Sequence, residues 1–284
     1  MKNGSTIPFE LQALRDTNQA DLADVCALYR KFIIDEVLQH GGHFSANLGT
    51  IELTIALHYV LQTPVDQLVW DVGHQAYLHK VLTGRKSTFN TIRKKEGLSG
   101  FPKQSESVFD VFGTGHSSTS ISAVLGLAEA DKLLDIHRQH VAVIGDGSLT
   151  GGMAWEALNN AAQSDTNILI IVNDNQMGID PNAGALNQYL NNVKTAPNFF
   201  TDLGFQYFHT ADGHDIQQMV NQLKDLTYID GPKIWHVKTI KGKGYAEAES
   251  EQTKWHAVKY VKIKEGDAAV QGDKFQEVFG QTLL

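Results

Sequence analysis

The sequence has a single cysteine, Cys26, in a chain of 284 residues. A lone cysteine cannot form a disulfide within the chain, so the sequence predicts a reducing compartment, and Cys26 falls in a helical pattern typical of core residues. The chain also lacks an apolar N-terminal segment of the signal-peptide kind and any run of eighteen apolar residues. We therefore expect neither secretion by a signal peptide nor a membrane span, and we expect a cytoplasmic protein.

Positive charge is also in short supply, because 24 Lys and Arg stand against 32 Asp and Glu, for a net charge of −8. This balance argues against nucleic acid and anionic membranes as main partners, since both attract basic surfaces. One basic stretch is expected to be a solvent-exposed face, and it comprises Arg85, Lys86, Arg93, Lys94 and Lys95. A hydrophobic content of 42% is enough for a large core, and we favour one large α/β domain.

The most informative stretch runs from Val141 to Asn175, VAVIGDGSLTGGMAWEALNNAAQSDTNILIIVNDN. An apolar run that ends in Gly-Asp-Gly, a helical pattern and a second apolar run that ends in Asn-Asp-Asn predict a strand, a helix and a strand. A parallel crossover brings both strand ends to the same edge of the sheet. Asp146 and Asn175 should therefore lie close together in space.

An aspartate and an asparagine in one crevice are oxygen ligands that suit Mg²⁺, which completes its shell with water and phosphate oxygens. The predicted ligand is a metal-bound diphosphate, because the glycines of this stretch and the start of the following helix admit an anion. Gly-Asp-Gly alone is a common tight turn, and only its pairing with Asn-Asp-Asn about thirty residues later argues for a site.

This pairing resembles the thiamine diphosphate motif of the transketolase-type enzymes. The resemblance implies that Asp146 and Asn175 are Mg²⁺ ligands, with Asn175 also at the cofactor, and that Met177 adds its backbone carbonyl. Gly147 and Ser148 would contact the diphosphate. The fold that the resemblance implies is a three-layer, doubly wound, mainly parallel sheet with helices on both faces.

Three further runs are similar to the N-terminal part of the 1-deoxy-D-xylulose-5-phosphate synthase family. They are GGHFSANLGTIELTIALHYV from residue 41, WDVGHQAYLHKVLTGR from residue 70 and FGTGHSSTSISAVLGLAEA from residue 112. Together with KGKGY from residue 241, the resemblance implies cofactor contacts from His74, Gly115, His116, Ser117 and Tyr245. It also implies proton transfer by His43 and His256. Without the resemblance, an isolated histidine is more often structural, GHSS is a helix cap and KGKGY is a basic turn.

Some features depart from the family pattern. Residues 179–200 contain little regular pattern and are expected to form an active-site loop, where family members usually carry a much longer insertion. Gln104, Gly178 and Ala183 stand where Arg, Ser and Val are expected. These departures leave the cofactor assignment intact and leave the acceptor substrate open.

We expect residues 1–265 to form the diphosphate-binding domain with an N-terminal arm. Residues 266–284 are expected to be a linker and the start of a pyrimidine-binding domain that this chain lacks. In the family, that domain carries the glutamate that activates the cofactor and the arginines that hold the acceptor phosphate. The resemblance therefore implies a homodimer, or pairing with a chain that supplies the C-terminal half.

Three functions remain open at this stage. The first is the condensation of pyruvate with glyceraldehyde 3-phosphate, with loss of CO₂, in which this chain supplies the half of the enzyme that binds thiamine diphosphate and Mg²⁺. The second is the cofactor-binding subunit of a split transketolase that acts on another sugar phosphate. The third is a non-catalytic subunit that binds the cofactor or only a partner chain.

Overall fold

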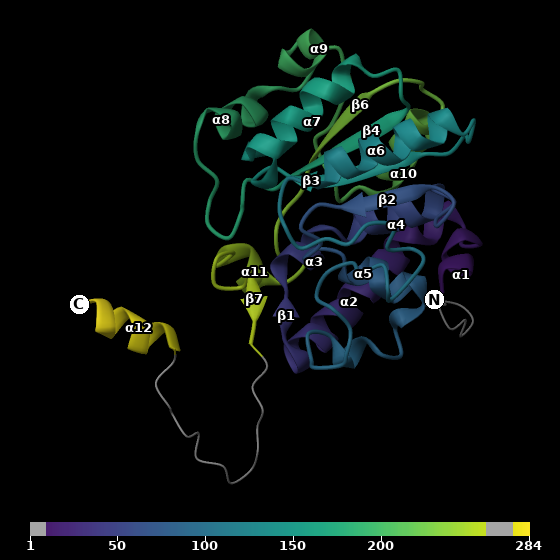
Figure 1. Cartoon of the computed structure of the whole chain (residues 1–284). Coiled ribbons are helices and arrows are strands. Elements are labelled where there is room, and N and C mark those ends of the chain that lie inside the picture. Colours follow the sequence, from purple (N-terminus) through teal and green to yellow (C-terminus); the bar gives the residue numbers. More distant parts are fainter. Residues whose placement is uncertain (1–9, 260–274) are drawn as a thin grey trace.

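The computed structural model describes residues 10–259 and 275–284. Its centre is a parallel sheet of five strands in the order β2-β3-β4-β6-β5 (Figure 1). The strands are β2 (Gln67–Trp70), β3 (His140–Gly145), β4 (Ile168–Asp174), β5 (Gln206–Thr210) and β6 (Lys233–Lys238). This arrangement confirms the α/β class and the parallel sheet, and both sequence motifs of the central stretch lie at the ends of neighbouring strands, β3 and β4.

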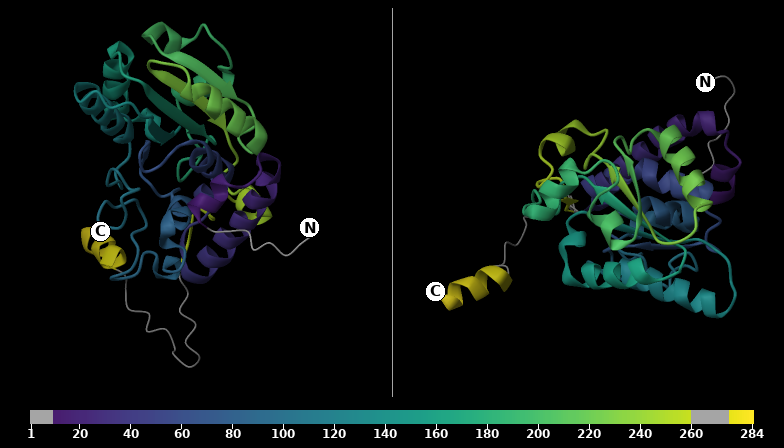
Figure 2. Two further views of the ribbon diagram at one scale, coloured as in Figure 1. Left: turned by 90° about the vertical axis from the view of Figure 1, so that its right-hand side faces the viewer. Right: turned by 90° about the horizontal axis from the view of Figure 1, so that it is seen from above.

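Helices cover both faces of the sheet. The α-helices of the described ranges are α1 (Leu11–Arg15), α2 (Leu22–His40), α3 (Ser45–Gly49), α4 (Ile51–Val60), α5 (Tyr77–Lys80), α6 (Ser120–Leu133), α7 (Gly152–Gln163), α8 (Ala185–Asn192), α9 (Phe199–Leu203), α10 (Ile216–Thr227), α11 (Ala246–Ser250) and α12 (Phe275–Leu283). Seen from above, the teal helices α6 and α7 lie on one side of the sheet, and the purple and blue helices and the yellow-green α10 lie on the other (Figure 2). The expected three layers are therefore present. None of the helices within the described ranges is long and apolar enough to span a membrane.

The alternation of side chains along each strand builds two separate cores. In β3, Val141 and Val143 point into the core beneath α2, α4 and α10, whereas Ala142 and Ile144 point into the core beneath α6 and α7. Strands buried on both faces need nearly continuous apolar sequence, which is the pattern that predicted them. Cys26 lies in the first core and is 4% exposed, as expected.

A second, short sheet joins segments that are far apart in the sequence. β1 (Gly42–His43) pairs antiparallel with β7 (Ala257–Val258), so that His43 lies opposite Ala257 (Figure 1). His43 and His256, the two residues expected to transfer protons, are thereby brought to the same place. Their ring centroids are 5.4 Å apart.

Residues 179–200 are more regular than expected, because α8 and the start of α9 lie within the predicted loop. The helical pattern of α8 is hard to recognise in the sequence because the segment is rich in asparagine, which is a weak helix former. Leu186, Tyr189 and Leu190 nevertheless form an apolar stripe that packs on the second core. Part of the expected linker, residues 266–274, lies outside the described residues. Residues 275–283 form α12, and the proposed domain boundary stays a prediction.

Candidate active site

A cavity of about 470 Å³ opens at the C-terminal ends of β3 and β4. Of the residues expected at the site, those that line it are His43, His74, Ser117, Asp146, Gly147, Ser148, Asn175, Met177 and His256. They come from segments spread over more than two hundred residues of the chain, and the parallel sheet and the β1–β7 pair bring them together. Open α/β sheets bind ligands at this edge.

The two expected metal ligands face this cavity together. Gly145 pairs with Asn173 in the sheet, so β3 and β4 end at the same level. Asp146 Oδ2 accepts a hydrogen bond of 2.7 Å from the backbone N–H of Gln176, and Asn175 Oδ1 accepts one of 3.0 Å from Met177. Because a side-chain oxygen can accept more than one bond, both residues retain capacity for a cation.

Asp146 is 4% exposed, and no ion pair joins it to a Lys, Arg or His within the described ranges. Burial, and then the neighbouring carboxylate of Asp174, raise the pKa of Asp146 above its usual range. Burial also opposes the charge of Asp174, but hydrogen bonds from His236 and Lys238 lower the pKa of Asp174. A buried carboxylate of this kind favours a bound cation, since a cation would offset the cost of its ionisation.

The donors that surround Asp146 fit Mg²⁺ bound together with a phosphate group. No group of three or more His, Cys, Asp or Glu side chains in the described part of the chain could hold a metal. One carboxylate, one amide and one carbonyl would leave positions for phosphate and water oxygens, as Mg²⁺ sites usually do. Three polar atoms of the lining are buried without a hydrogen-bond partner in the described structure, and a bound ligand could supply one. They are His74 Nδ1, Gln75 Oε1 and His256 Nδ1.

Three histidines gather on one side of the cavity. The ring centroid of His43 lies 5.4 Å from that of His74 and 5.4 Å from that of His256. Burial, then Arg93 and His256, lower the pKa of His43 to about 4. Burial, then His43 and His256, lower the pKa of His74 to about 3, and burial followed by Lys241 lowers the pKa of His256. All three rings are therefore neutral near pH 7.

Asn47 positions two of these histidines, and sequence reasoning missed it. Its Nδ2 donates to the carbonyl oxygens of His43 and His74, at 2.9 and 2.8 Å. Its Oδ1 accepts from the backbone N–H of Tyr77 at 2.9 Å. Asn47 is 1% exposed, so a single buried amide joins three segments around the cavity.

Asp71 is a second buried side chain that positions a segment at the cavity, in this case the loop before α6. It is 1% exposed, and its carboxylate accepts from the backbone N–H groups of Ser118 at 2.8 Å and Ser120 at 3.1 Å. These contacts hold the neighbouring Ser117 at the cavity. The signal was present in the sequence, because Asp71 begins the Asp-Val-Gly-His run, but nothing there indicated its partner.

Lys241 is the only Lys or Arg among the described residues that line the cavity. It is 1% exposed, and its Nζ donates to the carbonyl oxygen of Gly178 at 2.5 Å. Burial lowers the pKa of Lys241, whereas the charges of Asp146 and Asp180 oppose that shift. A buried ammonium group at this edge gives the cavity one fixed positive charge for an anion.

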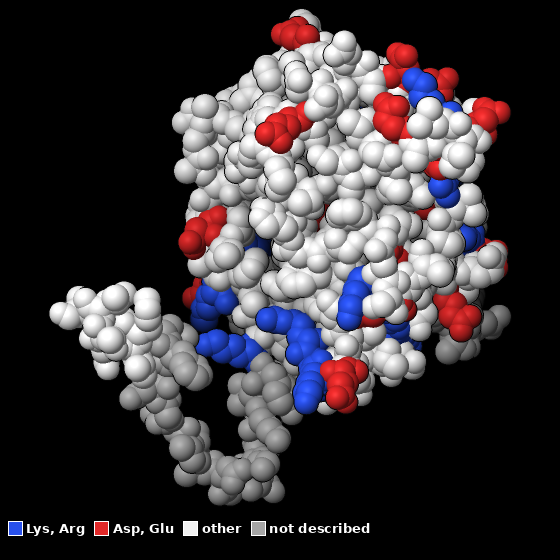
Figure 3. All heavy atoms as spheres, viewed as in Figure 1, with Lys and Arg blue, Asp and Glu red and all other residues white. Residues whose placement is uncertain are grey.

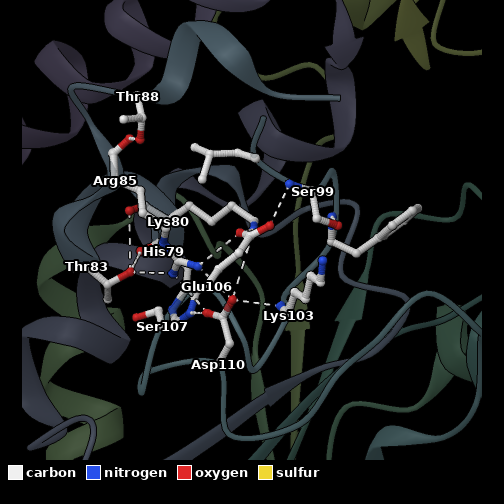
Figure 4. Close-up of polar contacts among 12 residues, drawn as sticks. His79, Lys80, Thr83, Arg85, Thr88, Ser99, Lys103, Glu106, Ser107 and Asp110 are labelled. Carbon is white, nitrogen blue, oxygen red and sulfur yellow. Dashed lines mark hydrogen bonds and ion pairs between the residues drawn. The ribbon is translucent and has the colours of Figure 1, made fainter. Parts of the chain in front are cut away.

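The expectation that Arg85 belongs to an exposed basic face is wrong. Arg85 is 6% exposed and makes a bidentate contact with Asp110, with Nη1–Oδ2 and Nη2–Oδ1 distances of 2.6 and 2.8 Å. His79 also contacts Asp110, and Lys80 pairs with Glu106 (Figure 4). We call these five residues the buried charge cluster. Residues of opposite charge that lie far apart in sequence gave no sign of this pairing.

The buried charge cluster supports one wall of the cavity. Glu106 Oε1 accepts from the backbone N–H of Ser99 at 2.7 Å, and Asp110 Oδ2 accepts from that of Lys103 at 2.7 Å (Figure 4). Between these two anchors lies Phe101, which lines the cavity and has its ring centroid 5.8 Å from that of His43. The cluster thus fixes the segment that carries Phe101.

Some expected residues do not line the cavity. Gly115 and His116 lie in the adjacent loop, and Tyr245 packs against Phe44 and Trp255, with centroid distances of 5.2 Å to both. Of the positions that depart from the family pattern, Gly178 lines the cavity, whereas Gln104 and Ala183 are exposed. Roles for all of these residues remain predictions.

The sheet order and the placement of the cavity define the class of protein. The fold is the one that transketolases use: it superposes on the transketolase from Campylobacter jejuni with a TM-score of 0.68 and 21% identity, over 88% of this chain and 41% of that one. The transketolase from Leishmania mexicana gives a TM-score of 0.68 and 19% identity, over 81% and 38%. The chain is therefore an α/β protein of the transketolase fold.

Within this class, the chain belongs to the 1-deoxy-D-xylulose-5-phosphate synthase family, whose model matches residues 8–199 and 193–239. The synthase from Cytophaga hutchinsonii is 47% identical, over 96% of this chain and 50% of its own length. The synthase from Halothermothrix orenii is 45% identical, over 95% and 49%. The chain thus spans about half the length of the curated relatives that it matches.

Proposed function

We propose that this chain binds thiamine diphosphate and Mg²⁺ and supplies the diphosphate-binding half of a 1-deoxy-D-xylulose-5-phosphate synthase. The synthase reaction would join pyruvate to glyceraldehyde 3-phosphate with loss of CO₂. The observation that carries the proposal is the convergence of Asp146 and Asn175 on one cavity, at the ends of adjacent strands. Membership of a family that uses this cofactor supports it further.

In this proposal, Asp146, Asn175 and the carbonyl of Met177 hold Mg²⁺, and Gly147 and Ser148 contact the diphosphate. The ammonium of Lys241 offsets the negative charge that enters the cavity. Bound thiamine diphosphate supplies a nucleophilic carbon and an electron sink, while the protein positions it and controls protons.

The histidines have the chemistry for proton transfer. Their lowered pKa values keep His43 and His256 neutral near pH 7, and a neutral imidazole can both accept and donate a proton. His256 Nδ1 is buried and has no hydrogen-bond partner in the described structure, so it is the atom that we assign to hold a proton beside the substrate. Phe101 and the surrounding wall would limit access of water to this end of the cavity.

Titration calorimetry of the chain with thiamine diphosphate and Mg²⁺ tests the proposal. We expect Mg²⁺-dependent binding that Asp146→Ala abolishes, because the substitution removes the one carboxylate among the proposed ligands. The matched control is Asp165→Ala, whose side chain is 92% exposed and which does not line the cavity. Unchanged affinity in Asp146→Ala, with the chain folded, would contradict the assignment.

Product analysis separates the synthase from a split transketolase. With a C-terminal half present, pyruvate and glyceraldehyde 3-phosphate should yield CO₂ and 1-deoxy-D-xylulose 5-phosphate. A transketolase would instead transfer a two-carbon unit from a ketose phosphate and release no CO₂. Absence of cofactor binding would leave only a non-catalytic subunit.

A further inference from the structure

His214 lies outside the cavity, in the turn before α10, and its side chain is only 7% exposed. Its Nε2 accepts a hydrogen bond of 2.8 Å from the backbone N–H of Ile240. Because a backbone N–H can only donate, Nε2 carries no proton. The proton of the neutral ring is then on Nδ1, which donates to Glu52 Oε2 at 2.9 Å. The ring is thereby fixed in one tautomer.

Glu52 is held in turn by Arg30. The guanidinium Nη2 pairs with Glu52 Oε1, and Nη1 donates to the carbonyl oxygens of Leu48 at 2.6 Å and Lys243 at 2.7 Å. Burial opposes the charge of Glu52, but hydrogen bonds from His214 and Arg30 lower its pKa. The loop after β6 is therefore held by hydrogen bonds at two points, at Ile240 by His214 and at Lys243 by Arg30.

The turn that carries His214 is itself fixed on the sheet. The backbone N–H of Gly213 donates to the carbonyl oxygen of Lys238 at 2.8 Å. A Cβ at position 213 would lie 2.6 Å from Val237 Cγ1 and 2.7 Å from that carbonyl oxygen, so only glycine allows this approach. His214 is thus held between the end of β6 on one side and Glu52 of α4 on the other.

Lys241, the buried cation of the cavity, lies between these two hydrogen-bonded points of the loop. The position of its ammonium group follows from the backbone at residues 240–243, because the stem is enclosed. We propose that His214 is a positioning residue: as the Nδ1–H tautomer it holds the backbone of Ile240 and so places Lys241 Nζ for an anion in the cavity. This inference rests on the proposed function, since it takes the anion to be a diphosphate.

A matched pair of substitutions separates positioning from packing. In His214→Gln, the side-chain oxygen reaches the place of Nε2 and can accept from Ile240. In His214→Asn, the shorter amide reaches only the place of Nδ1, so the Ile240 N–H loses its acceptor. His214→Ser is a second variant that lacks both contacts and should behave like the asparagine variant.

The measurements are calorimetric titrations of the full chain with Mg²⁺–thiamine diphosphate and with Mg²⁺–pyrophosphate. We expect affinity for both to fall about tenfold in His214→Asn, roughly the effect of one lost hydrogen bond, and to stay within about threefold of the unaltered chain in His214→Gln. Hydrogen exchange at the Ile240 amide, measured without ligand, should be accelerated in His214→Asn and His214→Ser but not in His214→Gln.

Lys241→Met provides the test that His214 acts through the lysine. In that background, adding His214→Asn should cause no further loss of affinity, because coupled residues are not additive. Equal losses in the glutamine and asparagine variants, or a full further loss in Lys241→Met, would overturn the inference while the proposed function stood. If the unaltered chain bound neither ligand, the proposed function would fail, and this inference with it.

Discussion

At the scale of single residues, the proposed Mg²⁺ site contains a buried carboxylate, Asp146, that forms no ion pair with a Lys, Arg or His of the described residues. Asp146 accepts hydrogen bonds from the backbone N–H groups of Gly147 and Gln176, yet its pKa is raised by burial and by Asp174. Backbone donors alone therefore do not offset the cost of its ionisation. A divalent ion would do so, which makes metal binding and deprotonation of Asp146 a coupled event.

This coupling predicts a pH dependence. A raised pKa means that the folded chain binds the Asp146 proton more tightly than the unfolded chain, so stability from this group falls as pH rises above the ordinary aspartate pKa of about 4. Because Mg²⁺ requires the ionised form, its binding should release a proton and strengthen from pH 6 to pH 8. The melting-temperature increase on adding Mg²⁺ and thiamine diphosphate should therefore be larger at pH 8.

Calorimetry in two buffers of different ionisation enthalpy measures the released proton directly. Asp180→Asn is the matched control, because Asp180 is exposed and near the cavity, and it should keep the full pH dependence. Asp146→Asn should lose it. Binding that is equally strong at both pH values and releases no proton would contradict the coupling.

At the scale of elements, the buried charge cluster stabilises a long irregular segment. Residues 98–118 contain no helix or strand of their own, and they are held by Glu106 and Asp110 at one end and by Asp71 at the other. Hydrogen bonds from His79 and Arg85 lower the pKa of Asp110 against the effect of burial. Asp110 is therefore held in its charged form, whereas burial lowers the pKa of His79, and the members of the cluster depend on one another through these contacts.

Asp110→Asn tests this dependence, because it removes the carboxylate that makes the bidentate contact with Arg85 and leaves Glu106, at 3.6 Å, as the remaining carboxylate beside Arg85. Breaking a buried ion pair typically costs about 3–5 kcal/mol, so we expect a loss of free energy of unfolding of that size in urea titrations. Glu251→Gln is the control, since its pair with Lys254 is exposed and should change stability by at most about 1 kcal/mol. Similar losses in the two variants would contradict a special role for the cluster.

The elements that could be predicted from the sequence are those with local signals. β3, α7 and β4 follow from apolar runs and a helical period, and the strand ends follow from parallel crossover geometry. α8 was not predicted because its asparagines, which are weak helix formers, obscure the helical spacing of its apolar residues. Arg85 and Asn47 were missed because their partners lie 25 to 30 residues away, and His214 because Glu52 lies 162 residues away. None of these three contacts affects the composition of the chain or the period of its apolar residues.

At the scale of the whole molecule, we predict association with a second protein surface. The face shown in Figure 3 has a broad central area with few Lys, Arg, Asp or Glu side chains, and its basic side chains lie at the lower edge and along the right side. Interfaces are depleted of charged residues at their centre. Ile179 lines the cavity and is still 63% exposed, so the site opens towards solvent at an apolar lip. A second protein surface over this lip would enclose the cavity.

The relatives are about twice as long as the segment that matches this chain. We therefore expect the 284-residue chain to bind thiamine diphosphate but to release no CO₂ from pyruvate by itself. Adding the remaining half of the Cytophaga hutchinsonii synthase should restore CO₂ release in the presence of glyceraldehyde 3-phosphate. The physical reason is that a cofactor held only at its diphosphate end is positioned but not activated, and reaction requires both.

Activity in this mixture should depend on both components. Replacing the chain with its Asp146→Ala variant should abolish CO₂ release, whereas Asp165→Ala should leave it unchanged. Sedimentation of the mixture should show a complex larger than either half. CO₂ release by the chain alone at the rate of the mixture would contradict the division of labour. A stable complex that binds the cofactor but does not convert pyruvate would also contradict it. In that case, enclosing the cavity would not be sufficient for the reaction.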